Sequence, residues 1–252
     1  MKISPDRFCL LPVLLLGTSV LLLAGCGAIQ REFLFFPSHH AGNNGLAEWK
    51  KQGQVIGYSR QVPEPQNVWL MLHGNGGQAA DRTYAIRCFS DGDSVFILEY
   101  PGYGARAGKP SKASFDAAAA EAYLVLRETF PKTPVCVIGE SLGSGPACVL
   151  AGQTPPPDKI VLVVPFDTLK SVAADHVPVL PTGLILRGSW DNVHSLSAYG
   201  GPVEIFGAER DDVIPVEHAR KLAGSIAQAK FHSIPGGHND WSGTGHVEIR
   251  NP

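Results

Sequence analysis

The chain has 252 residues, of which 44% are hydrophobic and 17% are charged. This composition is typical of a folded globular protein, and the length is sufficient for one large core. The formal net charge of −2 offers no basic field that could neutralise phosphates, so nucleic acid is excluded as an expected partner.

The N-terminus has the layout of an export signal. Lys2 and Arg7 precede an apolar stretch over residues 8–23. That stretch ends in the sequence Leu23-Ala24-Gly25-Cys26, which resembles the lipobox of bacterial lipoproteins. The resemblance implies that Cys26 receives a diacylglycerol and becomes the new N-terminus after cleavage.

We therefore expect a signal peptide over residues 1–25, an anchor and linker over 26–45, and a folded domain over 46–252. The multiple acyl chains of a lipoprotein would hold the protein on a membrane of the cell envelope. Gly27 after the cysteine favours the outer membrane in the lipoprotein resemblance. The alternative is an uncleaved signal anchor that spans the bilayer.

Short apolar runs alternate with helical patterns from residue 55 onward. The runs bounded by turn residues predict strands at 55–60, 68–72, 94–99, 135–138, 160–164, 202–206 and 231–234. Between them, helices are expected at 79–89, 115–130 with Ser114 as its cap, 141–152 and 216–229. This alternation predicts a mostly parallel sheet flanked by helices on both faces, with catalytic residues at the carboxyl ends of the strands.

Two glycine-rich motifs follow predicted strands. His73-Gly74-Asn75-Gly76 stands where a loop could supply half of an oxyanion hole. Gly139-Glu140-Ser141-Leu142-Gly143 matches the G-x-S-x-G nucleophile elbow between a strand and a helix. We expect Ser141 to be the nucleophile, the backbone N–H groups of Asn75 and Leu142 to bind the oxyanion, and His73 to be structural.

A base and an acid are expected later in the chain. His238 follows the last predicted strand, whereas His176, His194, His218, His232 and His246 suit surface roles better. Asp211 follows the strand before it, and Asp212 next to it reads as a helix-start charge. Asp167, after another strand, is the alternative acid.

Together, these motifs resemble the α/β-hydrolase superfamily over roughly residues 33–241. The pieces Phe33-Leu34-Phe35-Phe36-Pro37 and Glu99-Tyr100-Pro101-Gly102 are similar to small bacterial hydrolases grouped as serine-aminopeptidase-like. The resemblance implies the α/β-hydrolase fold with a small cap, here expected over 166–201. It also implies a final helix, which the 14 residues after His238 leave in question.

The remaining cysteines favour no metal and no disulfide. With Cys9 in the signal and Cys26 lipidated, Cys88, Cys136 and Cys148 remain, and the last two suit small buried hydrophobes. A disulfide remains an alternative. No Cys/His spacing indicates a metal site, and we expect no cofactor.

The expected activity is cleavage of carboxylic esters or thioesters through an acyl-enzyme. Its substrate would be a small-molecule or lipid acyl compound. Peptide or amide hydrolysis is the first alternative, and a non-catalytic envelope lipoprotein that keeps the fold is the second. The sequence does not predict the oligomeric state.

Overall fold

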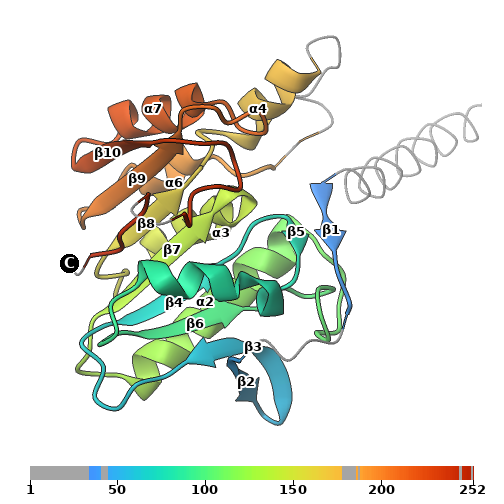
Figure 1. Ribbon diagram of the computed structural model, residues 1–252, viewed down its shortest axis with the longest axis vertical. Helices are drawn as coiled ribbons and strands as arrows, with labels where there is room; N and C mark the ends of the chain where they lie inside the picture. The colour runs from blue at the N-terminus through green and yellow to red at the C-terminus, as the bar shows by residue number, and fades with distance from the viewer. Residues whose placement is uncertain (1–33, 41–44, 178–185, 187, 244–245, 251) are drawn as a thin grey trace, which may run out of the picture.

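A computed structural model describes residues 34–40, 45–177, 186, 188–243, 246–250 and 252. An eight-stranded sheet runs through the molecule in the order β10-β9-β8-β7-β4-β6-β3-β2 (Figure 1). The strands are β2 (Ala47–Lys51), β3 (Gln54–Arg60), β4 (Val68–Leu72), β6 (Ser94–Leu98), β7 (Val135–Glu140), β8 (Ile160–Val163), β9 (Val203–Ala208) and β10 (Ala229–Ile234). The six strands β10, β9, β8, β7, β4 and β6 pair parallel with their neighbours in the sheet. At the other edge, β3 pairs antiparallel with β6, and β2 pairs antiparallel with β3. The mostly parallel sheet is therefore confirmed.

The central strands are buried on both faces, which explains their continuous apolar sequence. Successive side chains of a strand point to opposite faces. In β4, Leu70 and Leu72 therefore pack into one core, and Trp69 and Met71 pack into the other. The two hydrophobic cores therefore pack on opposite faces of β4.

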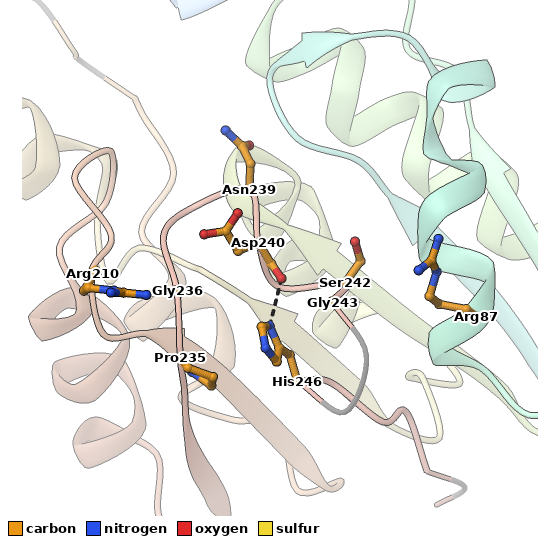
Figure 2. Close-up of a pocket in the computed structure, with 9 residues that line it drawn as sticks. All are labelled: Arg87, Arg210, Pro235, Gly236, Asn239, Asp240, Ser242, Gly243 and His246. Atoms are coloured by element: carbon orange, nitrogen blue, oxygen red, sulfur yellow. Dashed lines mark hydrogen bonds between the residues drawn. The ribbon is translucent and has the colours of Figure 1, made fainter.

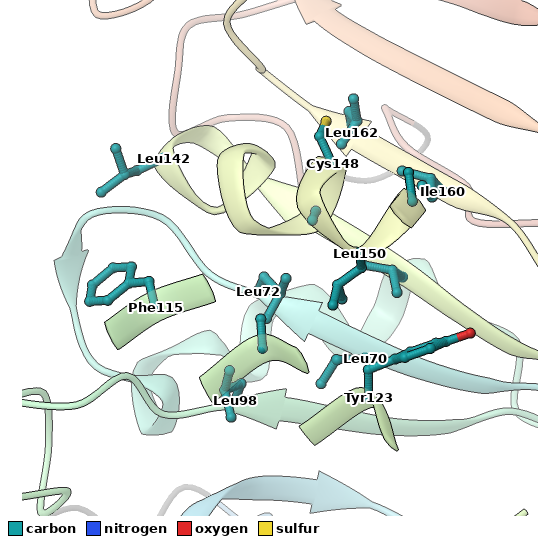
Figure 3. Packing of buried hydrophobic residues seen from close by; sticks show 14 of the residues in the cluster. Leu70, Leu72, Leu98, Phe115, Tyr123, Leu142, Cys148, Leu150, Ile160 and Leu162 are labelled. Carbon is teal, nitrogen blue, oxygen red and sulfur yellow. The ribbon is translucent and has the colours of Figure 1, made fainter. Parts of the chain in front are cut away.

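Helices α2 (Lys112–Thr129), α3 (Ser144–Val149) and α7 (Val216–Ser225) cover the first face. Figure 3 shows side chains of α2 and α3 interleaved with those of β4, β6 and β8. On the opposite face lie the 3₁₀ helix η2 (Ala79–Cys88) and the C-terminal segment.

Helix α2 begins earlier than predicted. Ser111, not Ser114, is the N-cap, and its hydroxyl accepts the N–H of Ser114 at 3.1 Å. Ser114 instead makes the second hydrogen bond of the capping box, in which its hydroxyl accepts the N–H of Ser111 at 3.0 Å. The predicted helix at 141–152 likewise divides into η3 (Ser141–Gly143), α3 and η4 (Leu150–Gly152).

The segment 166–201, expected to be a cap, is partly core. It contains α4 (Leu169–His176) and α6 (Asn192–Leu196). Trp190 is 2% exposed, and the Asn192 amide donates to Ser144 Oγ at 3.1 Å on α3. The stretch from Trp190 onward therefore packs on the helix that follows the nucleophile motif. Part of what precedes it, residues 178–185 and 187, lies outside the described residues.

Residues 246–250, near the C-terminus, pack against the domain without forming a helix or a strand. Val247 and Ile249 are buried in the second core, and the Ile249 N–H donates to the Cys88 carbonyl at 2.8 Å. Cys88, Cys136 and Cys148 are buried free thiols, and burial was predicted for the last two. Burial raises the pKa of Cys88 to about 11 and that of Cys136 to about 12, so both stay neutral.

Two short strands form a separate parallel pair, β1 (Phe36–Pro37) with β5 (Gly76–Gly77). Residues 34–40, which the sequence assigned to the linker, thus contact the loop after β4 (Figure 1). The expected signal peptide and Cys26 lie outside the described residues. Among the residues that are described, no helix has the length and hydropathy of a membrane span.

Candidate active site

Ser141 lies on a sharp turn between β7 and η3, with a left-handed φ of +52°. Neighbouring glycines permit this turn. A Cβ at Gly143 would lie 2.1 Å from the Leu72 carbonyl oxygen, and one at Gly139 would lie 2.7 Å from Ala147 Cβ. Only glycine fits at these two positions, so the G-x-S-x-G spacing is a steric requirement of this turn.

The structure brings Ser141, His238 and Asp211 into one hydrogen-bonded line. His238 Nε2 is 2.8 Å from Ser141 Oγ, and its Nδ1 is 2.7 Å from Asp211 Oδ2. Because the carboxylate only accepts, Nδ1 carries the hydrogen and Nε2 is left to accept the hydroxyl proton. This arrangement can generate a serine alkoxide during attack on a carbonyl.

Asp211 is fixed by its own loop. Its Oδ1 accepts the backbone N–H groups of Val213 at 2.9 Å and Ile214 at 2.8 Å, which leaves Oδ2 for His238. Its neighbour Asp212 is exposed. Of the two adjacent aspartates, Asp211 is therefore the one the structure places against the histidine.

The alternative acid, Asp167, lies in a second Asp–His pair. Its Oδ1 is 2.8 Å from His218 Nδ1 and accepts the Ser171 hydroxyl at 2.7 Å, while Lys221 contacts Oδ2. His218 Nε2 faces Asp175 Oδ2 at 3.0 Å. The surface role predicted for His218 is wrong, because this ring is 5% exposed and joins α7 to α4.

The loop from His73 to Gly77, named the oxyanion loop after the role expected for it, lies against Ser141. A Cβ at Gly74 would lie 3.5 Å from Ser141 Cβ. The Asn75 side-chain oxygen accepts the Tyr103 hydroxyl at 3.2 Å and the Phe36 N–H at 3.3 Å. Leu142 is in the first turn of η3, where N–H groups lack intrahelical acceptors and favour negative charge.

His73 is fully buried beneath this loop. Its Nδ1 is 2.7 Å from the Gly74 carbonyl oxygen, its Nε2 is 3.5 Å from Glu99 Oε1, and Tyr100 packs on the ring at 4.5 Å between centroids. Glu99 in turn accepts the Ala79 N–H at 3.1 Å. His73 and Glu99 thus support the start of the loop and the residues just after it, a role that fits the structural interpretation of this histidine.

Glu140 is a site residue that the sequence reasoning missed. It precedes the nucleophile, is 6% exposed, and accepts the Gly74 N–H at 3.0 Å. Tyr84 and Trp241 also donate to it. The available signal was a carboxylate at the end of an otherwise apolar strand, since a buried charge requires partners.

An open pocket of about 520 Å³ lies beside the loop that follows β10. Figure 2 shows Arg87, Arg210, Asp240 and His246 around it. None of the side chains of Ser141, Asp211 or His238 lines this pocket. Within the described residues, no group of three or more His, Cys, Asp or Glu side chains has the geometry of a metal site.

Comparison with known proteins identifies the family and the fold. The family model of the alpha/beta hydrolase fold matches residues 67–182. Protein Bem46 of Schizosaccharomyces pombe is 31% identical over 75% of this chain and 67% of its own length. The lysophosphatidylserine lipase ABHD12 of Danio rerio is 28% identical over 73% of this chain and 51% of its own length. The chain thus spans about half to two thirds of these curated relatives.

Among solved structures, an esterase of Pyrococcus furiosus, Pf2001, superposes with a TM-score of 0.63. The alignment covers 82% of this chain and 91% of that one at 14% identity, so it supports the fold alone. Fold, family model and sequence relatives agree with one another. The chain belongs to the α/β-hydrolase family and has its fold.

Proposed function

We propose that this chain is a serine hydrolase that cleaves carboxylic esters, or thioesters, through an acyl-enzyme. The observation that carries the proposal is the continuous line from Asp211 through His238 to Ser141, with hydrogen bonds of 2.7 and 2.8 Å. Such a line activates a hydroxyl that is otherwise a weak nucleophile. Membership of a hydrolase family supports the same activity.

In the first half-reaction, Ser141 Oγ attacks the carbonyl carbon while His238 Nε2 takes its proton. The tetrahedral intermediate collapses when His238 returns that proton to the leaving group, which leaves the acyl group on Ser141. A water molecule, deprotonated by His238, then repeats the sequence and releases the acid. Asp211 holds the imidazole in the required tautomer and stabilises its protonated form.

The oxyanion is bound by backbone N–H groups of Asn75 and Leu142 in this proposal. These groups lie on the oxyanion loop and in the first turn of η3, on two segments that meet at Ser141. Removing one such donor typically costs about 10²- to 10³-fold in kcat. No cofactor takes part in these steps.

We further propose that the acyl substrate is apolar and drawn from a lipid surface. Phe36, which is 55% exposed, lies on β1 beside the oxyanion loop. Val213, which is 46% exposed, lies on the loop that carries Asp211. Exposed apolar groups at these two places are suited to contact an acyl chain. The zebrafish relative is named a lysophosphatidylserine lipase, which supports lysophospholipids as test substrates.

Lipidation of Cys26 would place the enzyme on such a surface, and Gly27 favours the outer membrane. Phe36 lies ten positions after Cys26, a reach of at most about 36 Å. A Cys26→Ser variant is expected to accumulate as unprocessed precursor and to lose labelling by a fatty-acid probe. Unchanged labelling would contradict the anchor.

Fluorophosphonate labelling of the full chain in detergent tests the proposed chemistry. We expect the wild type to be labelled and Ser141→Ala to remain unlabelled. In a second assay, the wild type should hydrolyse p-nitrophenyl esters with a maximum rate at one acyl-chain length. Faster cleavage of aminoacyl arylamides than of matching esters would favour amide hydrolysis. Absence of labelling in a folded wild type would favour a non-catalytic scaffold.

A further inference from the structure

The oxyanion loop is tied to the protein on both sides of Asn75. On one side, the Gly74 N–H donates to Glu140 Oε2 at 3.0 Å. On the other side, the Arg82 guanidinium donates to the Gly76 carbonyl oxygen. These two ties hold the peptide group directly before the one that carries the Asn75 N–H and the peptide group two places after it. They thereby restrain the segment that contains one of the two donors assigned to the oxyanion.

The two tying side chains belong to one buried network. Arg82 Nε lies 3.8 Å from Glu140 Oε2, and its Nη1 donates to the Tyr84 hydroxyl at 3.1 Å. The Tyr84 hydroxyl in turn donates to Glu140 Oε1 at 2.7 Å. Glu140 is 6% exposed, so solvent does not compete strongly for these contacts.

Each hydrogen-bond partner of the Glu140 carboxylate among the described residues is a donor. Besides Gly74 and Tyr84, the Trp241 indole N–H donates to Oε1 at 2.9 Å. Burial tends to raise the pKa of Glu140, but the charge of Arg82 and these hydrogen bonds outweigh burial and lower it. An acceptor-only, ionised carboxylate is what this set of donors requires.

One side chain therefore touches three segments of the site. Glu140 immediately precedes Ser141, Gly74 belongs to the oxyanion loop, and Trp241 lies three residues after His238. We propose that Glu140 and Arg82 are a positioning pair that holds the Asn75 N–H in register with the Ser141 hydroxyl. The inference rests on the proposed serine hydrolase function and adds to it the residues that preorganise its oxyanion hole.

Glu140→Gln is the direct test, because it keeps size and shape but replaces one acceptor oxygen with an amide donor. That donor would face either the Gly74 N–H or the N–H and O–H groups of Trp241 and Tyr84. In the first orientation the amide donor faces the Gly74 N–H and displaces the loop directly. In the second it disturbs Tyr84 and Trp241, and in both orientations the negative charge beside Arg82 is lost. A shift of the Asn75 N–H by a fraction of an ångström weakens its bond to the oxyanion.

We expect Glu140→Gln in the full chain to lower kcat for a p-nitrophenyl ester by about 10- to 100-fold, with KM within about threefold. The inhibition constant of a trifluoromethyl ketone, which forms the same oxyanion, should rise by the factor lost in kcat/KM. Glu217→Gln makes the same chemical change at an exposed position on α7 and should leave all three quantities unchanged.

Arg82→Lys provides a second variant should Glu140→Gln fold poorly. It keeps the positive charge but loses the planar group that reaches the Gly76 carbonyl. We therefore again expect a lower kcat with a nearly unchanged KM. Amide hydrogen exchange over residues 73–77 adds a readout independent of catalysis. It should accelerate in both variants relative to wild type and to Glu217→Gln.

A kcat and ketone affinity equal to wild type in these variants would overturn the inference, as would a loss confined to KM. Unchanged exchange over 73–77 would also overturn it. If the wild type neither labels with a fluorophosphonate nor hydrolyses any ester, the proposed function fails. The exchange measurement then still decides whether Glu140 and Arg82 hold the loop.

Discussion

Two Asp–His pairs follow neighbouring strands of the same sheet, and only one of them has the geometry of a catalytic pair. Asp211 follows β9 and contacts His238 Nδ1 at 2.7 Å, and Asp167 follows β8 and contacts His218 Nδ1 at 2.8 Å. The difference lies at the other ring nitrogen. His238 Nε2 faces the Ser141 hydroxyl at 2.8 Å, whereas His218 Nε2 faces the Asp175 carboxylate at 3.0 Å.

This difference assigns a role to each pair. A hydroxyl has a proton that an imidazole can take, and an ionised carboxylate has none. His238 can therefore act as a base, while His218 on α7 can only link the carboxylate of Asp167, just before α4, to that of Asp175 on α4. An Asp–His contact by itself is not a catalytic signature, and the third partner decides its function.

The largest expected effect comes from removing the base. His238→Ala should lower kcat/KM for p-nitrophenyl esters by on the order of 10⁴-fold, because Ser141 then has no proton acceptor. Steady-state hydrolysis and the rate of fluorophosphonate labelling both measure this loss. A decrease below about tenfold would mean that another group deprotonates Ser141.

Asp211→Asn should lower kcat by about 10³-fold or more, because the amide can donate to Nδ1 and favour the wrong tautomer of His238. Asp212→Asn is the matched control, since this neighbour is exposed and should leave kcat within about twofold. Equal losses in the two variants, measured at one pH, would contradict the assignment of the acid.

In the second pair, the same substitution should affect stability and not chemistry. Asp167→Asn removes a fully buried charge that faces His218 and Lys221, which should lower the free energy of unfolding by about 2 to 3 kcal/mol. Denaturant unfolding measures the loss, and kcat of the folded variant should stay within about threefold of wild type. A large loss of kcat with normal stability would make Asp167 the catalytic acid.

The smallest expected effect is a pH dependence of stability. Burial tends to raise the pKa of Asp167, but the contacts with Lys221, Ser171 and His218 outweigh burial and lower it to about 2. A depressed pKa stabilises the folded state above the unfolded value near 3.8, and this contribution is lost as pH falls toward about 2. This contribution of Asp167 to the free energy of unfolding amounts to about 2 kcal/mol.

Comparing unfolding free energies at about pH 5 and about pH 2.5 in wild type and Asp167→Asn isolates that contribution. The wild type should lose more stability on acidification than the variant, because only the wild type titrates this carboxyl group. Equal losses would show that Asp167 does not contribute to acid sensitivity.

The sequence predicted the parts of the fold that depend on local patterns. Apolar runs such as 68–72 and 160–164 indicate strands buried on both faces, and the structure confirms both with a shift of at most one residue. Edge strand β2 was missed because Ala-Glu-Trp-Lys-Lys carries one apolar anchor, Trp49, on a largely exposed strand. Its pairing with β3 is a tertiary contact.

Site residues were predictable where chemistry and strand position coincide. Ser141, His238 and Asp211 each follow a strand, and the structure brings the three together. Glu140 and the second Asp–His pair were missed because no sequence motif indicates their partners, and the one signal for Glu140 was a carboxylate at the end of an apolar strand. Sequence separation is not the reason, since Ser141 and His238 are 97 residues apart and motifs still marked both of them. Only the folded chain shows Glu140 against Gly74 and Asp167 against His218.

The central claim is that Ser141 carries the acyl group during turnover. Rapid-quench mass spectrometry of the full chain mixed with a p-nitrophenyl ester tests it directly. We predict an acyl adduct on the peptide that contains Ser141, formed in a burst and absent from Ser141→Ala. Ester turnover without any adduct on that peptide, or an adduct that persists in Ser141→Ala, would contradict the account.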